Sequence, residues 1–541
     1  MQISGKIIDI FHRRIFPGII TIKNGRIQSI VESENASSNF ILPGFIDGHI
    51  HIESSMLVPS EFARIASTHG TVATVSDPHE IANVMGIDGI EFMIDNANQV
   101  PFKFFFGAPS CVPATPFETA GGKFGNEELE YLLKKENILY LSEMMNVPGV
   151  LNRDPGEMYK IELAKKYGKQ IDGHAPGLRG EDAKTYVDSG ITTDHECVTL
   201  DEALEKIQYG MTIQIREGSA TRDLHALMPL IETHPDNIMF CSDDRHPDNL
   251  VEGHINLMVK KAIDEGYDIF NILQVACINP VKHYGLDVGL LREGDPADFI
   301  VIKNLEKLNI LATYVDGEKI AENGKAIITS KNVSPINRFK ATSKSPNDFA
   351  VPIEKGKLKV IDVLDGQVIT GTKLTNIETQ NGLVISDLNH DILKITVLNR
   401  YEDTKPAMAF IHNFGLKSGA IASSVSHDSH NIIAVGTSDE EIANAVNLII
   451  EHKGGVSLSN GETKRVLPLP VAGLMTDTDG YFVAEKYSAL ETMAKEMGSP
   501  LQSPFMTLSF MALLVIPQLK LSDKGLFDGN SFELVHNFTI E

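Results

Sequence analysis

The chain has 541 residues, of which 42% are hydrophobic and 22% charged, a composition typical of a soluble globular protein that is too long for one core. Its net charge of -24 argues against non-specific binding to nucleic acid or to an anionic membrane. The four cysteines are widely spaced and the first residues lack a signal-peptide pattern. We therefore expect a cytoplasmic protein without a disulfide framework or a thiolate zinc site.

In chain order, residues 1–43 carry short β-type runs, and Lys23-Asn24-Gly25 between two of them is a hairpin turn signal. From Gly44 onward, apolar runs alternate with helical patterns, for example at 60–69, 155–167, 200–208 and 222–232. The eight apolar runs lie at 44–51, 71–77, 101–108, 138–144, 169–174, 191–195, 211–216 and 237–243. Eight strand–helix units predict an α/β fold with a (β/α)8 barrel over residues 44–285, and a doubly wound open sheet is the alternative.

The rest of the chain predicts two more units. Residues 286–330 return to β-type texture, and we expect them to form one small β domain with residues 1–43, assembled from both sides of the barrel. Residues 328–345 are polar and read as a linker. Residues 346–541 are expected to form a C-terminal domain of mixed α/β type. The apolar run 510–516 is too short to span a bilayer and predicts a core element.

Side chains that bind metals stand at the ends of the predicted strands. His49 and His51 are two residues apart in one strand, so both imidazoles point to the same face. Functional residues of a barrel lie at the C-terminal ends of its strands. One histidine there is more often a packed residue than a ligand, but matching positions on several strands favour a metal site. The complete set is His49, His51, Glu143, His174, His195 and Asp243.

Six ligands are too many for one tetrahedral ion that keeps an open position, and they suit two ions bridged by Glu143. Water between two divalent ions becomes a hydroxide at neutral pH. Asp243 is expected to bind one ion and to accept the proton of that hydroxide when it attacks, which predicts hydrolysis of a C–N or similar bond. Asp244 points to the other face if the strand continues, so Asp243 is the preferred ligand.

These residues resemble the amidohydrolase superfamily, with the Pro43-Gly44-Phe45-Ile46-Asp47 strand before the histidine pair and Asn279-Pro280 with Gly294-x-x-Ala297-Asp298 after the last ligand. Within it, the chain is similar to the adenine deaminase family over nearly its whole length. The stretches that carry this similarity are 42–55 (LPGFIDGHIHIESS), 77–86 (DPHEIANVMG), 194–199 (DHECVT), 215–219 (IREGS), 416–424 (LKSGAIASS) and 427–432 (HDSHNI).

The resemblance implies hydrolysis of adenine to hypoxanthine and ammonia by a hydroxide bridging two metal ions, as part of purine salvage. It implies two divalent ions per chain, usually manganese, with iron or zinc as substitutes. The expected partner is a small purine, with no nucleic acid and no membrane, and we expect a homo-oligomer.

Other residues have two possible roles each. His79 is a substrate contact or accessory ligand, or else a loop residue capped by Asp77. Arg216 and Glu217 either read the donor and acceptor edge of a purine or form an ion pair with each other. Glu53 is expected to support the ligands from behind.

On resemblance alone, His427 and His430 are expected to close over the barrel mouth, with a plain domain contact as the alternative.

Two further functions stay open. One is another amidohydrolase that acts on a cyclic amide or another heterocycle. Cyclic amidases of this superfamily typically bridge their metals with a modified lysine near the fourth strand, where this chain has Glu143. The other is a noncatalytic barrel that binds a ligand, which has no reason to keep all six metal-binding side chains.

Overall fold

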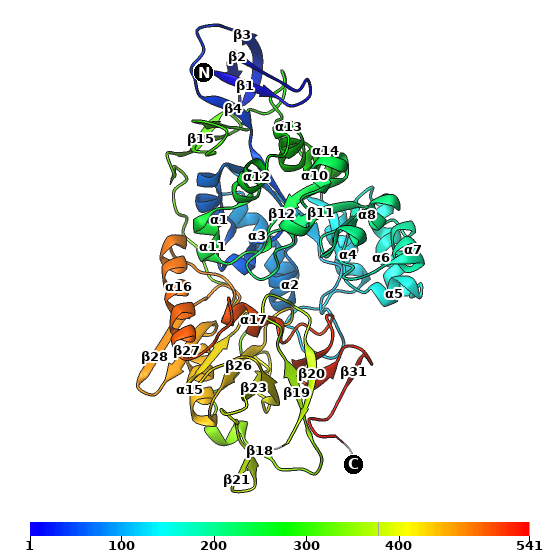
Figure 1. Cartoon of the computed structure of the whole chain (residues 1–541), viewed down its shortest axis with the longest axis vertical. Helices are drawn as coiled ribbons and strands as arrows, with labels where there is room; N and C mark the ends of the chain where they lie inside the picture. The colour runs from blue at the N-terminus through cyan, green and yellow to red at the C-terminus, as the bar shows by residue number, and fades with distance from the viewer. Residues whose placement is uncertain (377, 540–541) are drawn as a thin grey trace.

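The computed structural model describes residues 1–376 and 378–539. Three parts follow one another along the long axis of the molecule (Figure 1). A β sheet with the N-terminus lies at one end, a parallel sheet with its helices lies in the middle, and an α/β unit with the C-terminus lies at the other end.

The N-terminal sheet is built from two distant stretches of chain, joined where β14 pairs antiparallel with β4. Asn24 and Gly25 both have positive φ, 51° and 76°, which is the geometry of a tight hairpin turn and confirms the turn predicted there. The strands are β1 (Gln2–Asp9), β2 (Arg14–Lys23), β3 (Arg26–Glu32) and β4 (Phe40–Pro43), then β14 (Phe299–Ile302), β15 (Ile310–Val315), β16 (Glu318–Glu322) and β17 (Lys325–Ala326).

The central sheet is parallel and curled. A strand occurs at each of the eight predicted runs, and the short β13 follows the last of them. β13 pairs with β5, the first strand of the set, so the sheet bends back toward its own beginning. The strands are β5 (Phe45–His51), β6 (Thr71–Ser76), β7 (Lys103–Ala108), β8 (Ile138–Met144), β9 (Gln170–Gly173), β10 (Thr193–Asp194), β11 (Thr212–Arg216), β12 (Ile238–Cys241) and β13 (Asp243–Asp244). Ladder hydrogen bonds join them in two groups, β13-β5-β6-β7-β8-β9 and β10-β11-β12.

Helices cover the outside of this sheet, and local signals start several of them. Asp154 caps α6 and Pro155 occupies its first turn, as helix starts prefer. The prediction of one helix over 222–232 is wrong, because the segment is divided into α9 and α10. The division falls at Pro229, which has no N–H to continue the hydrogen bonding of a helix. The helices are α1 (Pro59–Ala66), α2 (His79–Met85), α3 (Ile87–Ala97), α4 (Asn126–Leu133), α5 (Val147–Leu151), α6 (Pro155–Lys166), α7 (Gly180–Asp188), α8 (Leu200–Gln208), α9 (Leu224–Leu227), α10 (Leu230–Thr233), α11 (Pro247–Glu252), α12 (Ile255–Asp264), α13 (Ile269–Leu273) and α14 (Asn279–Tyr284).

The C-terminal unit follows residues 329–345, which form neither helix nor strand. Its largest sheet has the order β20-β19-β24-β23-β26-β25-β27-β28, and α17 lies between this sheet and the central part (Figure 1). The helices are α15 (Asp439–His452), α16 (Gly480–Glu496) and α17 (Pro504–Phe510). The strands are β18 (Val351–Pro352), β19 (Leu358–Asp362), β20 (Gly371–Thr375), β21 (Thr379–Gln380), β22 (Leu383–Val384), β23 (Ile392–Leu398), β24 (Ala407–His412), β25 (Ala420–Ser423), β26 (Ile432–Gly436), β27 (Gly455–Asn460), β28 (Thr463–Pro468), β29 (Leu519–Ser522), β30 (Gly525–Asp528) and β31 (Glu533–Leu534).

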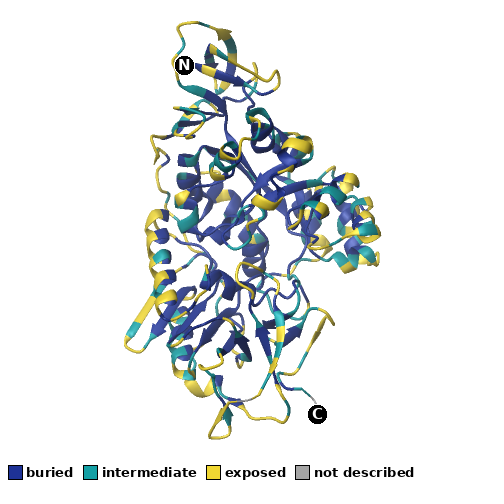
Figure 2. Cartoon of the chain, viewed as in Figure 1, coloured by how far each residue is buried: buried dark blue, intermediate teal, exposed yellow. Residues whose placement is uncertain are grey.

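The central part and the C-terminal unit share one hydrophobic core, which runs without a break from the parallel sheet into α17 and β29. Buried residues dominate both sheets, and exposed residues gather on the outer helices and loops (Figure 2). All four cysteines are unpaired and buried. None of the described helices combines the length and the apolar character that crossing a membrane requires.

Candidate metal centre and substrate pocket

The six predicted metal-binding side chains meet at one end of the parallel sheet. His49 and His51 end β5, Glu143 lies near the end of β8, His174 and His195 directly follow β9 and β10, and Asp243 begins β13. All six are buried. Parallel strands end at the same edge of a sheet, which is why residues from distant parts of the sequence converge there.

The first group of donor atoms surrounds His51. Its Nε2 lies 3.2 Å from Nε2 of His49, 3.3 Å from Oε1 of Glu143 and 3.2 Å from Oδ1 of Asp243. Nδ1 of His51 is 3.2 Å from the carbonyl oxygen of Asp77. A hydrogen bond from Nδ1–H to that carbonyl leaves the lone pair on Nε2, which is the form that binds a metal.

The second group uses the other oxygen of the same carboxylate. Oε2 of Glu143 lies 2.9 Å from Nδ1 of His174 and 3.2 Å from Nε2 of His195. The two histidine nitrogens are 3.4 Å apart. Glu143 therefore presents one oxygen to each group, which is the geometry of a carboxylate that bridges two ions.

The spacing and the chemistry of these donors fit two metal ions. Ligand atoms bonded to one ion at about 2.0–2.2 Å lie roughly 3.0–3.6 Å from one another. The contacts within the two groups, between 2.9 Å and 3.7 Å, are close to that range. Burial and the neighbouring histidines hold the pKa of His49 well below its usual value, so this imidazole is neutral. Burial opposes ionisation of Glu143, but hydrogen bonds from His174, His195 and His51 lower its pKa well below the usual range.

Burial lowers the pKa of His195, but the Glu143 carboxylate outweighs it and raises that pKa to about 9. The surrounding carboxylates thus favour a positive charge at this position, which a metal ion can supply.

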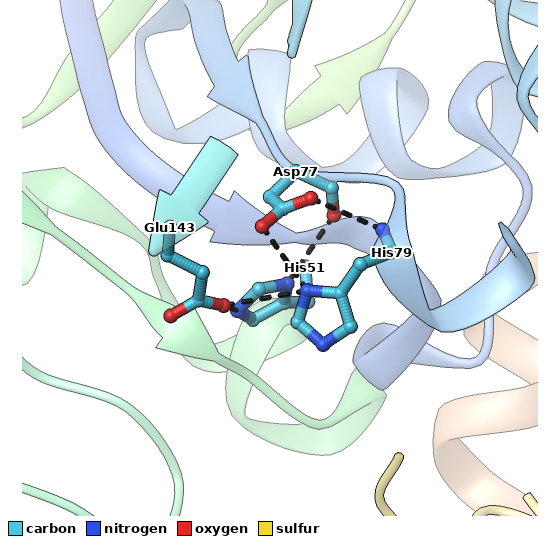
Figure 3. A group of neighbouring side chains, drawn as sticks. All are labelled: His51, Asp77, His79 and Glu143. Atoms are coloured by element: carbon cyan, nitrogen blue, oxygen red, sulfur yellow. Dashed lines mark hydrogen bonds and ion pairs between the residues drawn. The ribbon is translucent and has the colours of Figure 1, made fainter. Parts of the chain in front are cut away.

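Figure 3 shows how His79 joins the centre. Its Nδ1 lies 3.0 Å from Oδ2 of Asp77 and 3.3 Å from Oε1 of Glu143. The backbone N–H of His79 also donates to Asp77, which is the capping that the sequence predicted as one alternative. His79 is therefore both capped by Asp77 and in contact with the bridging carboxylate.

Arg216 and Glu217 do not pair with each other. Arg216 donates to both oxygens of Glu196 and, at 3.0 Å, to Oδ2 of Asp243. Glu217 faces the opposite way, into a separate cavity where its nearest cation is Lys261 at 3.7 Å. Glu217 therefore lies outside the pocket that Arg216 lines, because alternate residues of a strand point to opposite faces.

Asp244 also departs from its prediction. We expected it to point away from the site, but it lines the same pocket as Asp243, and its Oδ1 accepts a hydrogen bond from Ser54 at 2.5 Å. The backbone of Asp243 has a φ of 55°, in the left-handed region, which interrupts the pleat between β12 and β13. Alternation of side chains holds only along a regular strand, so the rule fails at this position.

Glu53 lies behind the centre rather than in the pocket. One of its oxygens accepts a hydrogen bond from the N–H of Ile81, at the start of α2. Burial, together with nearby Glu80, raises the pKa of Glu53 to about 7.

The C-terminal unit reaches into the site through His427 and His430. Nδ1 of His427 is 2.5 Å from Oε1 of Glu80, and His430 bonds to the other oxygen of the same carboxylate. Burial opposes the charge of Glu80, but His427, His79 and His430 lower its pKa well below the usual range. Both histidines thus make the contact between the two parts that was the alternative, and of the two only His427 lines the pocket.

Part of the pocket lining is apolar. Val368, Phe510, Leu513 and Ile516 line the pocket, and all four belong to the C-terminal unit. The ring of Phe510 stacks on the ring of His427, with centroids 5.0 Å apart and an angle of 18° between the planes. The pocket lining therefore combines charged groups of the central part with hydrocarbon of the C-terminal unit.

Our reading of the sequence did not single out four charged residues of this site. Glu196, Glu80 and Asp428 line the pocket, and Asp223 supports Arg216 at 3.1 Å. Three of the four lie inside the stretches 77–86, 194–199 and 427–432 that carry the family resemblance. Their position inside these stretches could have marked the three residues as candidates, whereas Asp223 lies outside all of them.

Comparisons with known proteins agree with this architecture. The model of the amidohydrolase family matches residues 40–320, and that of the adenine deaminase C-terminal domain matches residues 367–533. Proteins named adenine deaminase from Salinibacter ruber and from Sulfurovum sp. are 52% and 54% identical over 539 and 536 residues. One from Methanosarcina acetivorans is 52% identical over 548 residues. Each alignment covers 99% of both proteins. This chain belongs to the adenine deaminase family of amidohydrolases.

Proposed function

We propose that this protein hydrolyses adenine to hypoxanthine and ammonia, as a step of purine salvage in the cytoplasm. One observation carries the proposal: Glu143 presents its two oxygens to two separate groups of donors, in a chain whose full-length relatives are named adenine deaminase. The apolar part of the pocket lining suits the face of a flat base.

Two divalent ions fit the donor groups, with manganese as the first choice and iron or zinc as alternatives. One would be held by His49, His51, Glu143 and Asp243, and the other by Glu143, His174 and His195. When bound, such ions supply positive charge that acidifies water and polarises the ring to be attacked.

Asp243 is placed to move the proton. Its Oδ2 is held by Arg216 at 3.0 Å, while Oδ1 faces the donor groups, 3.2 Å from His51. We propose that this carboxylate takes a proton from the attacking water and passes it to the leaving amino group, which departs as ammonia. The oxygen of the water forms the new bond to the ring carbon that loses the amino group. Arg216 keeps the carboxylate oriented between the two transfers.

The C-terminal unit completes the pocket in this proposal. Phe510 and His427 would pack against the face of the base, and Glu80 would fix His427 by the hydrogen bond between the two parts. His79 sits between Glu80 and Glu143, at 3.3 Å from each carboxylate, within reach of the polar edge of a substrate.

We also propose a division of the whole chain into three domains. The strands from β5 to β13 would form one closed (β/α)8 barrel over residues 44–285, supported by the β13–β5 pairing and by the hydrogen bond from Thr192 N–H to Ile171 at 2.8 Å, beside β10 and β9. Residues 1–43 and 286–330 would form the small β domain, residues 346–541 the C-terminal domain, and the protein would assemble from several copies.

Ammonia release from adenine, adenosine, cytosine and guanine tests the proposal, with the metal content of the same sample measured in parallel. The expected result is turnover of adenine, little turnover of adenosine, and about two divalent ions per chain. Preference for the nucleoside, or full activity with one tightly bound ion, would contradict the proposal.

A further inference from the structure

One buried lysine lies directly behind the apolar part of the pocket lining. Lys520, in β29, is completely buried, with 0% of its surface exposed. Its Nζ donates to the carbonyl oxygen of Val368 at 2.6 Å and to that of Phe510 at 3.0 Å. Within residues 1–376 and 378–539, the structure gives this ammonium group no carboxylate partner.

A lysine in such a place is costly. Burial of an ammonium group removes its hydration, and two neutral carbonyl groups replace only part of it. Burial accordingly lowers the pKa of Lys520 to about 7. An apolar side chain of the same length would fill this space without the free-energy cost of burying an ammonium group. Packing alone therefore does not explain a lysine at this position.

Both carbonyl groups belong to residues that line the pocket. Phe510 is the last residue of α17, and a helix C-terminus favours a positive charge. Its carbonyl oxygen accepts from the N–H of Leu513 at 3.2 Å as well as from Lys520. The Phe510 ring stacks on His427, which is bonded to Glu80 on the central part. Lys520 is thus the outermost member of a chain of contacts that passes through Phe510 and His427 to Glu80.

We propose that Lys520 is a positioning residue for substrate binding, which fixes the pocket wall by holding the backbone of Val368 and Phe510 together. The inference rests on the proposed function, because it takes adenine as the substrate. Lys520 is not among the residues that line the pocket, so its loss should weaken adenine binding without changing the metal content. A looser wall should also discriminate less between adenine and bulkier purines.

The test compares Lys520→Met with Lys394→Met. Methionine keeps the length and volume of lysine but cannot donate. Lys394 is a matched control in the same unit: it is 1% exposed and donates to Phe349 and, at 2.6 Å, to Asp439, and it does not line the pocket. We expect Lys520→Met to raise KM for adenine roughly tenfold, in the range of a lost apolar contact, with kcat within about twofold. Lys394→Met should leave KM unchanged.

Two further measurements separate positioning from general damage. Lys520→Arg keeps the donors and should bring KM at least partly back, and Phe510→Leu, which removes the ring but leaves Lys520, should reproduce the rise in KM. An unchanged KM in Lys520→Met, or a loss of kcat together with metal, would overturn the inference. For a protein that does not turn adenine over, calorimetric titration with adenine gives Kd. If the wild type binds adenine but releases no ammonia, the proposed function fails, and the role of Lys520 is still tested by comparing Kd between wild type and Lys520→Met. If the wild type does not bind adenine, the proposed function and the inference both fail.

Discussion

Replacing Asp243 with asparagine is the sharpest test of the reaction proposed for this centre. The carboxylate has two different neighbours, with Oδ1 at 3.2 Å from Nε2 of His51 and Oδ2 at 3.0 Å from Nη1 of Arg216. Asparagine has the same size and still offers one carbonyl oxygen, but its amide nitrogen cannot accept a proton. If that oxygen faces the metal site, the amide NH2 group meets Arg216, where two donors oppose each other.

The expected loss of activity in Asp243→Asn depends on the groups that the substitution leaves in the site. His49, His51 and Glu143 still surround the first position, so most of the metal should stay bound. Loss of a positioned general base typically lowers a rate by about 10²–10⁴, which corresponds to about 3–5 kcal/mol in the activation barrier. We therefore expect kcat for adenine to fall by about 10²–10⁴ in a protein that keeps about two ions per chain.

The assay is ammonia release from adenine, with the ions counted by mass spectrometry on the same sample. Asp244→Asn is the matched control, because Asp244 lines the same pocket but bonds to Ser54 instead of Arg216. It should lose much less activity than Asp243→Asn. Near-normal turnover of Asp243→Asn with metal bound would refute the assignment of the base, and a larger loss in Asp244→Asn would then assign that role to Asp244. If metal and activity are lost in the same proportion, Asp243 acts as a metal ligand and not as the base.

Three other predictions follow from the same structure. His174→Ala removes a donor 2.9 Å from Glu143, so metal analysis should find about one ion fewer per chain, with activity lost; retention of both ions would contradict the second position. Glu80→Gln removes the charge between His427 and His430, and a melting curve should show a Tm lower by several degrees with a higher KM for adenine, whereas wild-type values would show that the contact is dispensable. Burial raises the pKa of Glu491 to about 7, against about 4.3 in the unfolded chain. The stability that this protonated group contributes is complete below pH of about 4.3 and is lost as the pH rises to about 7, by roughly 4 kcal/mol. Glu491→Gln should therefore raise Tm at pH 8 and leave it nearly unchanged at pH 4, and an equal shift at both pH values would contradict the assignment.

Local patterns in the sequence were sufficient to predict the strands and to select the six side chains that the structure brings together. The run at 138–144 coincides with β8 in the structure, and His49 and His51 share a face because side chains alternate along a strand. The six residues proposed as ligands could be found together because parallel strands carry their C-terminal residues to one edge of the sheet. The alternation of side chains along a strand involves only a few neighbouring residues, so it can be recognised without the tertiary structure.

The same local rule failed where the backbone leaves the regular strand. The positive φ of Asp243 turns both Asp243 and Asp244 into the pocket. A sequence pattern does not reveal such a break, because aspartate tolerates the left-handed region without requiring it. The helix predicted over 222–232 failed at Pro229 for a related reason, since apolar spacing favoured one helix and the missing N–H divided it.

The sequence by itself determined which residue types stand at the ends of the strands, and only the tertiary structure decided how charges pair across the molecule. Glu80 and His427 are 347 residues apart in the sequence, and Lys520 reaches Val368 across 152 residues. Arg216 joined Glu196 and Asp243 rather than its neighbour Glu217. These pairs form because a buried charge must find a partner among whatever groups the fold places within a few ångströms, and chain connectivity does not restrict that choice.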